Sequence, residues 1–357
     1  MSDRASARPA WHDSVFLRAV RREPVPHVPI WLMRQAGRYM AEYRAVRRQV
    51  PFLELCRKPD LCAEVMLLAV ERLGVDAAIL FSDLLLLLEP MGLRIEFTSG
   101  DGPVVENPLR GPADLNRFRE LEDPEAIQYV MEAVRATRAA LPAALPLIGF
   151  AGAPFTLASY AIEGGASRNY LRAKGLMYRE PQVWDAILGR ISRSVARYLN
   201  GQIAAGAQAV QLFDSWVGCL SPDDYRRYVL PHSRAVIEAI TPGVPVIHFA
   251  TGNPALLPLL AEAGGTVIGV DWRVRLDDAW RAIGHQRAIQ GNLDPAVLLT
   301  DRQQIRRAAE AILRQAAGRP GHIFNLGHGV LPDTPVENAI ALVEAVHELS
   351  QGAQATG

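Results

Sequence analysis

The sequence has little of what marks secreted, membrane-embedded or nucleic-acid-binding proteins. Its three cysteines, at positions 56, 62 and 219 of 357 residues, form no CxxC or CxC pair, which predicts a reduced, cytoplasmic protein without structural zinc. Apolar runs such as 84–88 are far shorter than the roughly 18 residues of a membrane helix, and charges interrupt the N-terminus where a signal peptide would be apolar. Lys plus Arg and Asp plus Glu both number 38, so no overall charge favours nucleic acid or a membrane surface.

Several motifs that would announce a cofactor or a nucleophile are also missing. The chain contains no GxGxxG after its first predicted strand and no GxxxxGK[ST], so nothing supports a nucleotide cofactor. It has no GxSxG nucleophile elbow and no HExxH or Cys/His spacing that indicates a metal. The sequence therefore predicts neither a cofactor nor a metal site.

What is present is an alternation of strands and helices. Eight short, nearly all-apolar runs are typical of strands buried on both faces, as in a parallel sheet: 28–33, 77–82, 146–150, 209–213, 244–249, 266–270, 288–290 and 323–326. Helical patterns lie between them: 61–73, 126–140, 183–204, 222–240, 277–282, 302–316 and 335–349. The order favours an α/β fold of the (β/α)8 TIM-barrel type over an open doubly wound sheet.

The domain organisation is simple. Residues 13–351 are predicted to form one barrel domain, with flexible tails at 1–12 and 352–357. One excursion follows the second strand: 93–97 and 103–106 flank a turn at 98–102 and predict a β-hairpin.

A concentration of arginine follows the first predicted strand. Arg34, Arg38, Arg44, Arg47 and Arg48 share the segment 34–48 with a single acid. Guanidinium groups stay charged and bind carboxylate or phosphate in a two-pronged fashion. Because such groups repel one another without an anion between them, the segment predicts a ligand with several negative charges, although the last three could equally form the solvated face of a helix.

Polar residues also follow the other predicted strands, where a parallel barrel places its active site. Asp83 follows the second strand; it could cap the next turn, but its place before five leucines favours a partly buried carboxylate. His328 lies between two glycines, which favours ligand contact. Asp214 and Asp271 fit a scaffolding role better, and His248 is as compatible with a core position as with a functional one.

At these residues the chain resembles the uroporphyrinogen decarboxylase family, from about residue 16 to 349. The matching segments are 33–39 (MRQAGRY), 81–83 (FSD), 152–156 (GAPFT), 213–216 (FDSW), 290–295 (QGNLDP) and 325–329 (NLGHG). The resemblance implies a cytoplasmic, homodimeric (β/α)8 enzyme without metal or organic cofactor. Such an enzyme removes the four acetate carboxyl groups of uroporphyrinogen III and gives coproporphyrinogen III.

The resemblance also implies roles for single residues. Asp83 and Arg34 would be catalytic, Asp83 as acceptor of the pyrrole N–H groups and Arg34 as a proposed proton donor, with a held water as an equal candidate because arginine is a very weak acid. Both would contact substrate, together with these residues: Arg38, Arg47, Tyr160, Ser215 and His328. Two alternatives are a zinc- and corrinoid-linked methyltransferase, disfavoured because no cysteine lies at or after His248, and a porphyrin carrier without catalysis.

Overall fold

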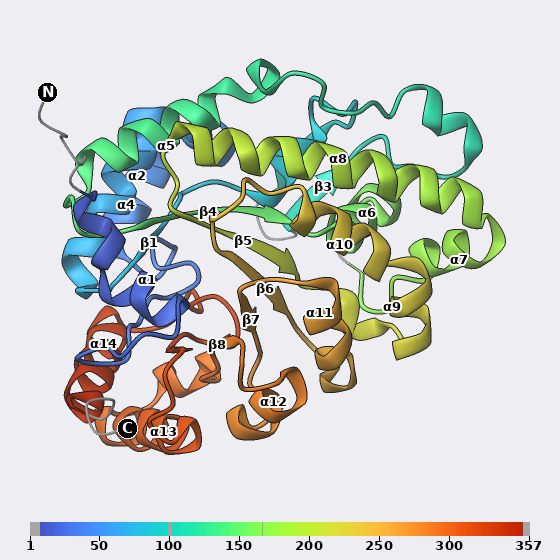
Figure 1. The fold of residues 1–357 in the computed structure, drawn as a ribbon. Helices are drawn as coiled ribbons and strands as arrows, with labels where there is room; N and C mark the ends of the chain where they lie inside the picture. Colours follow the sequence, from blue (N-terminus) through green and yellow to red (C-terminus); the bar gives the residue numbers. More distant parts are fainter. Residues whose placement is uncertain (1–7, 99–101, 166, 353–357) are drawn as a thin grey trace, which may run out of the picture.

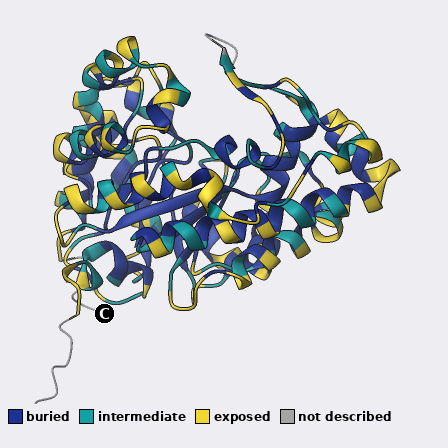
Figure 2. Ribbon diagram, turned by 90° about the horizontal axis from the view of Figure 1, so that it is seen from above, coloured by how far each residue is buried: buried dark blue, intermediate teal, exposed yellow. Residues whose placement is uncertain are grey.

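The computed structural model describes residues 8–98, 102–165 and 167–352. Its centre is a sheet of seven parallel strands in the order β1-β4-β5-β6-β7-β8-β9, surrounded by helices (Figure 1). The strands are β1 (Ala78–Ile79), β4 (Leu147–Gly152), β5 (Ala209–Asp214), β6 (Val246–Ala250), β7 (Val267–Gly269), β8 (Ala288–Gln290) and β9 (His322–Ile323). The strands are buried and the exposed residues lie on the outer helices (Figure 2), which confirms the barrel-type α/β fold.

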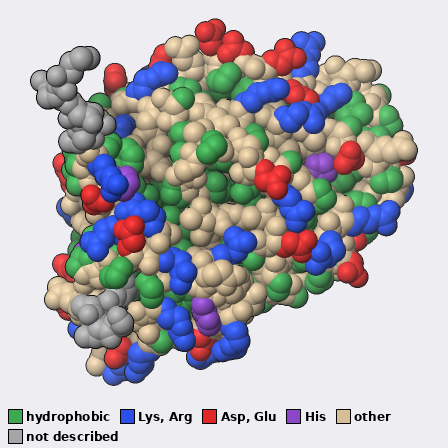
Figure 3. Space-filling view, viewed as in Figure 1, with side chains coloured by type: hydrophobic (Ala, Val, Ile, Leu, Met, Phe, Trp, Pro, Cys, Tyr) green, Lys and Arg blue, Asp and Glu red, His purple; other side chains and the backbone are tan. Residues whose placement is uncertain are grey.

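The α-helices precede, follow and separate the strands. They are α1 (Val15–Val20), α2 (Ala41–Gln49), α3 (Phe52–Cys56), α4 (Pro59–Leu73), α5 (Gln128–Ala140), α6 (Pro154–Glu163), α7 (Leu171–Arg179), α8 (Pro181–Ala205), α9 (Pro222–Tyr228), α10 (Leu230–Glu238), α11 (Leu257–Ala263), α12 (Leu276–Ile283), α13 (Arg302–Ala316) and α14 (Val336–Ser350). Within the described residues, no helix is long and apolar enough to cross a membrane. Acidic and basic side chains are interspersed on the face seen in Figure 3, in line with the balanced composition.

The first predicted strand, 28–33, does not form a regular strand. Residues 29–31, here called the closing segment, fill the gap between β9 and β1: Phe324 N–H donates to Pro29 O at 2.8 Å, and Asp76 N–H donates to Ile30 O at 2.8 Å. The ladder is short because Pro29 has no N–H and its neighbours donate to side chains, as when Val28 N–H donates to Ser350 Oγ at 2.9 Å. The closing segment nevertheless completes the ring of strands.

The helix predicted over 222–240 is divided in two. Helices α9 and α10 together cover residues 222–238. The break between them lies at Val229, whose φ of −127° is not helical. Pro231 explains the break, because its ring would clash with the carbonyl group four residues earlier in a continuous helix. Six of the described helices lie outside the predicted helical ranges: α1, α2, α3, α6, α7 and α11. Of these, α6 is apolar on nearly all sides and so lacks a one-sided pattern.

The hairpin excursion is confirmed. β2 (Ile95–Thr98) pairs antiparallel with β3 (Gly102–Val105), and residues 99–101 of the predicted turn lie outside the described residues. The predicted tails also lie mostly outside them, although Ala10–Asp13 forms a short 3-10 helix.

Candidate active site

The predicted site residues all follow strands at their carboxyl ends. Arg34 follows the closing segment, Asp83 follows β1, and Tyr160 lies on α6, which begins just after β4. Ser215 follows β5 and His328 follows β9. Because the strands are parallel, these ends meet at one mouth of the barrel.

Asp83 is a half-buried carboxylate held by the local backbone. It is the N-cap of the 3-10 turn Leu84–Leu88, and its Oδ1 accepts the N–H of Leu85 at 2.9 Å. Burial raises the pKa of Asp83 to about 6, against the opposing effects of the Leu85 N–H and the nearby Arg34 guanidinium. The capping and the ligand-facing interpretations are therefore compatible, since the second carboxylate oxygen takes no part in the cap.

Arg34 adopts an unusual backbone conformation. Its φ is +61°, in the left-handed region that residues other than glycine seldom occupy. Its side chain lies against Gly329, where an added Cβ would collide with Arg34 Cδ and Cγ. A residue larger than glycine beside His328 would therefore displace the Arg34 side chain from this position.

Tyr160 and His328 share this environment with Asp83 and Arg34. Burial, with a further contribution from the Asp83 charge, raises the pKa of Tyr160 to about 12. Burial and the positive charges of Arg34 and Arg273 lower the pKa of His328 to about 4. Both side chains are therefore neutral at physiological pH and offer hydrogen bonds rather than charge.

Arg38 and Arg47 form a second group around Tyr43. Burial raises the pKa of the Tyr43 phenol, and the two guanidinium charges act in the opposite direction by lowering it. Arg47 lies 5.5 Å from the centre of the Phe52 ring and donates to Val50 O. Arg44 turns back instead, and its Nη1 donates to the carbonyl oxygens of Arg38 and Tyr39 at 2.8 Å each. Arg44 therefore fixes the loop that presents Arg38.

Ser215 lies in the loop that follows β5. Its carbonyl oxygen accepts the hydroxyl of Thr251 at 2.7 Å, which joins the loops after β5 and β6. The next residue, Trp216, lies against Tyr160 with ring centroids 6.0 Å apart. Ser215 thus belongs to the wall that carries Tyr160.

The floor of the mouth is apolar and aromatic. Gln290 Nε2 donates to Gln211 Oε1 at 3.0 Å, and because β8 and β5 are not neighbours, both side chains point into the barrel. Phe213 lies two residues beyond Gln211 on β5 and so faces the same interior, nearer the carboxyl end. Its ring contacts Phe150 at 5.7 Å and Phe249 at 5.8 Å between centroids, both in edge-on geometry.

Two aspartates act as scaffold, in line with the sequence analysis. Asp271 accepts the N–H groups of Gly252, at 2.7 Å, and Arg273, at 2.9 Å. Asp214 is fully buried and accepts the Thr156 hydroxyl at 3.3 Å. His248 is also fully buried, with its Nε2 3.8 Å from Asp214 Oδ2, so it is a core residue paired with a scaffold carboxylate.

Arg273 is a cation at the mouth that the sequence analysis missed. Its guanidinium pairs with Asp271 and lies 4.3 Å from the centre of the Trp272 ring, and its charge acts on His328. Its side chain is 46% exposed, so it remains available to a ligand. The sequence did contain a signal for Arg273, because it directly follows Asp271 and Trp272 at the end of a predicted strand.

The arrangement combines an aromatic floor, one carboxylate with a raised pKa, and guanidinium groups on two sides. An apolar macrocycle with negatively charged side chains fits such a mouth, because its faces meet the aromatic rings while its carboxylates meet the arginines.

Comparisons with known proteins agree with this geometry. The family described as "Uroporphyrinogen decarboxylase (URO-D)" matches residues 12–349. A uroporphyrinogen decarboxylase of Carboxydothermus hydrogenoformans is 56% identical, over 95% of this chain and 97% of its own length. One from Sorangium cellulosum is 55% identical, with the same coverage.

A structural relative shows the fold alone. A methyltransferase from Methanosarcina mazei superposes with a TM-score of 0.77 at 24% identity, over 95% of this chain and 98% of its own. This methyltransferase thus shares the architecture of the chain. With a family match across nearly its whole length and relatives above 50% identity, the chain belongs to the uroporphyrinogen decarboxylase family.

Proposed function

We propose that the protein removes the carboxyl groups of the four acetate side chains of uroporphyrinogen III, giving coproporphyrinogen III and carbon dioxide. Family membership supports this activity. The observation that carries it is the Asp83 carboxylate, half-buried in the barrel mouth beside Arg34 and Tyr160.

The reaction needs an electron sink, because loss of carbon dioxide leaves an electron pair on the side-chain carbon. The pyrrole itself can serve. Protonation of the ring carbon that bears the acetate gives a cationic ring, and the electrons of the C–COO⁻ bond flow into it as carbon dioxide leaves. The exocyclic carbon is then protonated to a methyl group and the ring carbon loses the proton that it had gained, so each carboxyl group is exchanged for one net proton. The enzyme must deliver the proton, stabilise the cation and hold the leaving carboxylate.

Asp83 suits the second of these tasks. With a pKa near 6 it is largely ionised at neutral pH, and a fixed negative charge in a poorly solvated site stabilises a developing cation strongly. Its free oxygen would accept hydrogen bonds from the pyrrole N–H groups at the centre of the macrocycle.

The electrostatics of the site limit which groups can donate the proton. His328, with a pKa near 4, holds no acidic proton at neutral pH, and Tyr160, with a pKa near 12, is a weak acid. Arg34 is an equally weak acid, so it stays a candidate only through the family resemblance, beside a water held by Arg34 or Asp83. Arg38, Arg47 and Ser215 would bind the peripheral carboxylates.

The proposal extends to a cytoplasmic homodimer, which the family resemblance implies. Sedimentation equilibrium of the purified chain tests the assembly, and a mass near twice 39.1 kDa is expected.

An anaerobic incubation tests the activity. Reduced uroporphyrinogen III is incubated with the protein, and products are separated by chromatography while carbon dioxide is collected. Four equivalents of carbon dioxide per coproporphyrinogen are expected. Tight binding of the substrate without carbon dioxide release would make the protein a carrier and overturn the proposal.

A further inference from the structure

His27, Asp76 and His347 form a cluster outside the active site. His27 precedes the closing segment, Asp76 precedes β1, and His347 lies in the last turn of α14. The cluster therefore lies at the amino-terminal end of the barrel, opposite the mouth that contains Asp83. No motif announces it, because its members are far apart in the sequence.

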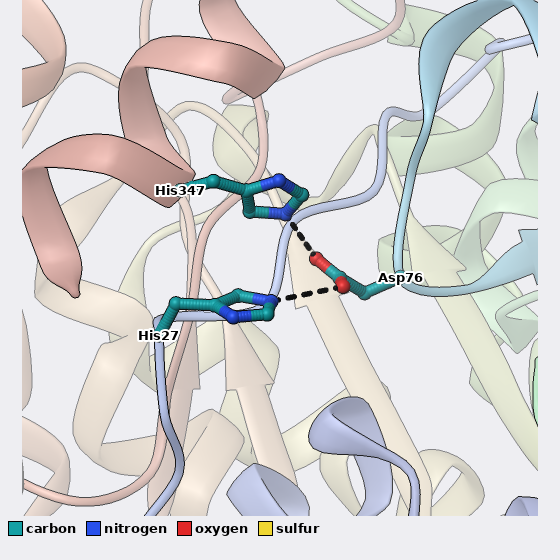
Figure 4. Close-up of side chains that lie close together, drawn as sticks. All are labelled: His27, Asp76 and His347. Atoms are coloured by element: carbon teal, nitrogen blue, oxygen red, sulfur yellow. Dashed lines mark hydrogen bonds and ion pairs between the residues drawn. The ribbon is translucent and has the colours of Figure 1, made fainter. Parts of the chain in front are cut away.

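The three side chains point at one another (Figure 4). His27 Nε2 is 3.1 Å from Asp76 Oδ1, and His347 Nε2 is 2.8 Å from Asp76 Oδ2. The two rings lie 4.4 Å apart between centroids. One ligand atom from each residue lies within 4.8 Å of the others, where a tetrahedral zinc site with bonds of about 2.0–2.1 Å needs separations of about 3.3 Å. Side-chain rotation has to close that difference when an ion binds.

The backbone around the cluster is already fixed. Asp76 N–H donates to Ile30 O and Ile30 N–H donates to Asp76 Oδ2, both at 2.8 Å. Val28 N–H donates to Ser350 Oγ at 2.9 Å, which ties the segment of His27 to the helix of His347. The ligands are thus held in place before any ion arrives, and Asp76 has a backbone partner that orients its carboxylate.

The cluster is partly accessible to solvent. The side chains of His27, Asp76 and His347 are 24%, 15% and 27% exposed, so an ion can enter and keep a water ligand. Two imidazoles and one carboxylate with an open position suit Zn²⁺ and similar divalent transition metals, and not the oxygen-loving Mg²⁺ or Ca²⁺.

We propose that the His27–Asp76–His347 cluster binds one divalent transition metal ion, of which Zn²⁺ is the best match. The ion takes the place of the two imidazole protons that hydrogen-bond to Asp76. It thereby links three parts of the chain: the segment just before the closing segment, the residues just before β1, and α14. It acts as a structural clip at the end of the barrel away from the chemistry, so turnover does not depend on it.

Cobalt titration tests the site. The full-length protein, freed of metal with a chelator, is titrated with Co²⁺, and both equilibrium dialysis and visible absorption are followed. One Co²⁺ per chain with a visible d–d band is expected, displaced by Zn²⁺, and Zn²⁺ is expected to raise Tm by several degrees.

Two variants on different segments locate the ion. His27→Gln and His347→Gln should each weaken Co²⁺ binding at least tenfold and abolish the Zn²⁺ shift in Tm, while the exposed His285→Gln should change neither. Asp76 is left intact because it also bonds the Ile30 backbone. Absence of stoichiometric binding, binding by both variants as tight as that of the wild type, or turnover that requires the ion would each overturn the proposal.

Discussion

At the scale of single residues, Asp83 combines two properties that oppose each other. The proposed mechanism requires its charge, yet burial disfavours that charge and raises the pKa to about 6. Because this folded-state pKa lies above the ordinary aspartate pKa of 3.8, the protonated carboxyl favours folding below pH 4, and that contribution is lost as pH rises through 6. At pH 8 the wild type therefore carries a cost on the order of 3 kcal/mol.

Asp83→Asn should separate activity from stability. The amide keeps the oxygen that caps Leu85 but removes the charge, so kcat/KM should fall at least about a hundredfold while Tm at pH 8 rises. Steady-state kinetics and thermal melts at pH 5 and pH 8 check both. Near-normal turnover would remove Asp83 from the mechanism, and the exposed Asp60→Asn is the matched control.

Arg38→Ala should chiefly weaken substrate binding. Its guanidinium is exposed at the mouth, where a peripheral carboxylate would pair with it, so KM should rise about tenfold with kcat nearly unchanged. Arg48→Ala, an exposed arginine on the same segment, provides the comparison. An unchanged KM for the Arg38 variant would count against a carboxylate clamp.

Arg273→Gln tests the cation that the sequence analysis overlooked. The substitution leaves Asp271 buried with its two backbone donors, so the fold should persist, and KM should rise several-fold because one charge at the mouth is lost. Arg273→Lys should recover only part of the effect, since lysine does not stack on Trp272 as a planar guanidinium does. Equal KM values in all three proteins would place Arg273 outside the substrate's reach.

At the scale of elements, α13 ends with an avoidable strain. Ala317, at its C-cap, has φ +54°, in the left-handed region where a Cβ is unfavourable. Glycine adopts this conformation without a clash, although it also makes the unfolded chain more flexible.

Ala317→Gly should therefore raise the free energy of unfolding by up to about 1 kcal/mol. Ala311→Gly, inside the same helix, should lower it by about 1 kcal/mol because glycine is a poor helix residue. Urea unfolding followed by circular dichroism measures both. Destabilisation by Ala317→Gly would show that chain entropy outweighs the strain at the cap.

At the scale of the whole molecule, a buried histidine links folding to pH. His322 on β9 is fully buried, its Nε2–H donates to Gly291 O at 3.0 Å, and burial lowers its pKa from 6.5 to about 4. The neutral ring favours folding fully above pH 6.5. That stability is lost as pH falls from 6.5 towards 4, by on the order of 3 kcal/mol.

We expect the free energy of unfolding to fall between pH 7 and pH 4.5 partly through His322. In His322→Gln, which can still donate to Gly291 O, the fall should be smaller by 1–3 kcal/mol, although overall stability is lower. Urea unfolding at several pH values tests this, with His285→Gln as the exposed control. Identical pH slopes for wild type and His322→Gln would contradict the assignment.

The sequence by itself determined the alternation of buried strands and helices and the positions of the polar residues at strand ends, because apolar periodicity and chain order are local properties. Asp83, Arg34 and His328 could be named in advance for that reason, and Tyr160 through the family resemblance. Only the tertiary structure showed that the closing segment bonds mainly through side chains and single backbone contacts, that Arg44 holds the loop of Arg38, and that Arg273 reaches the mouth. The same holds for His27, Asp76 and His347, which meet across 49 and 271 residues of chain. Such contacts depend on where the barrel closes. A pattern of neighbouring residues in the sequence does not show which distant residues the fold brings together.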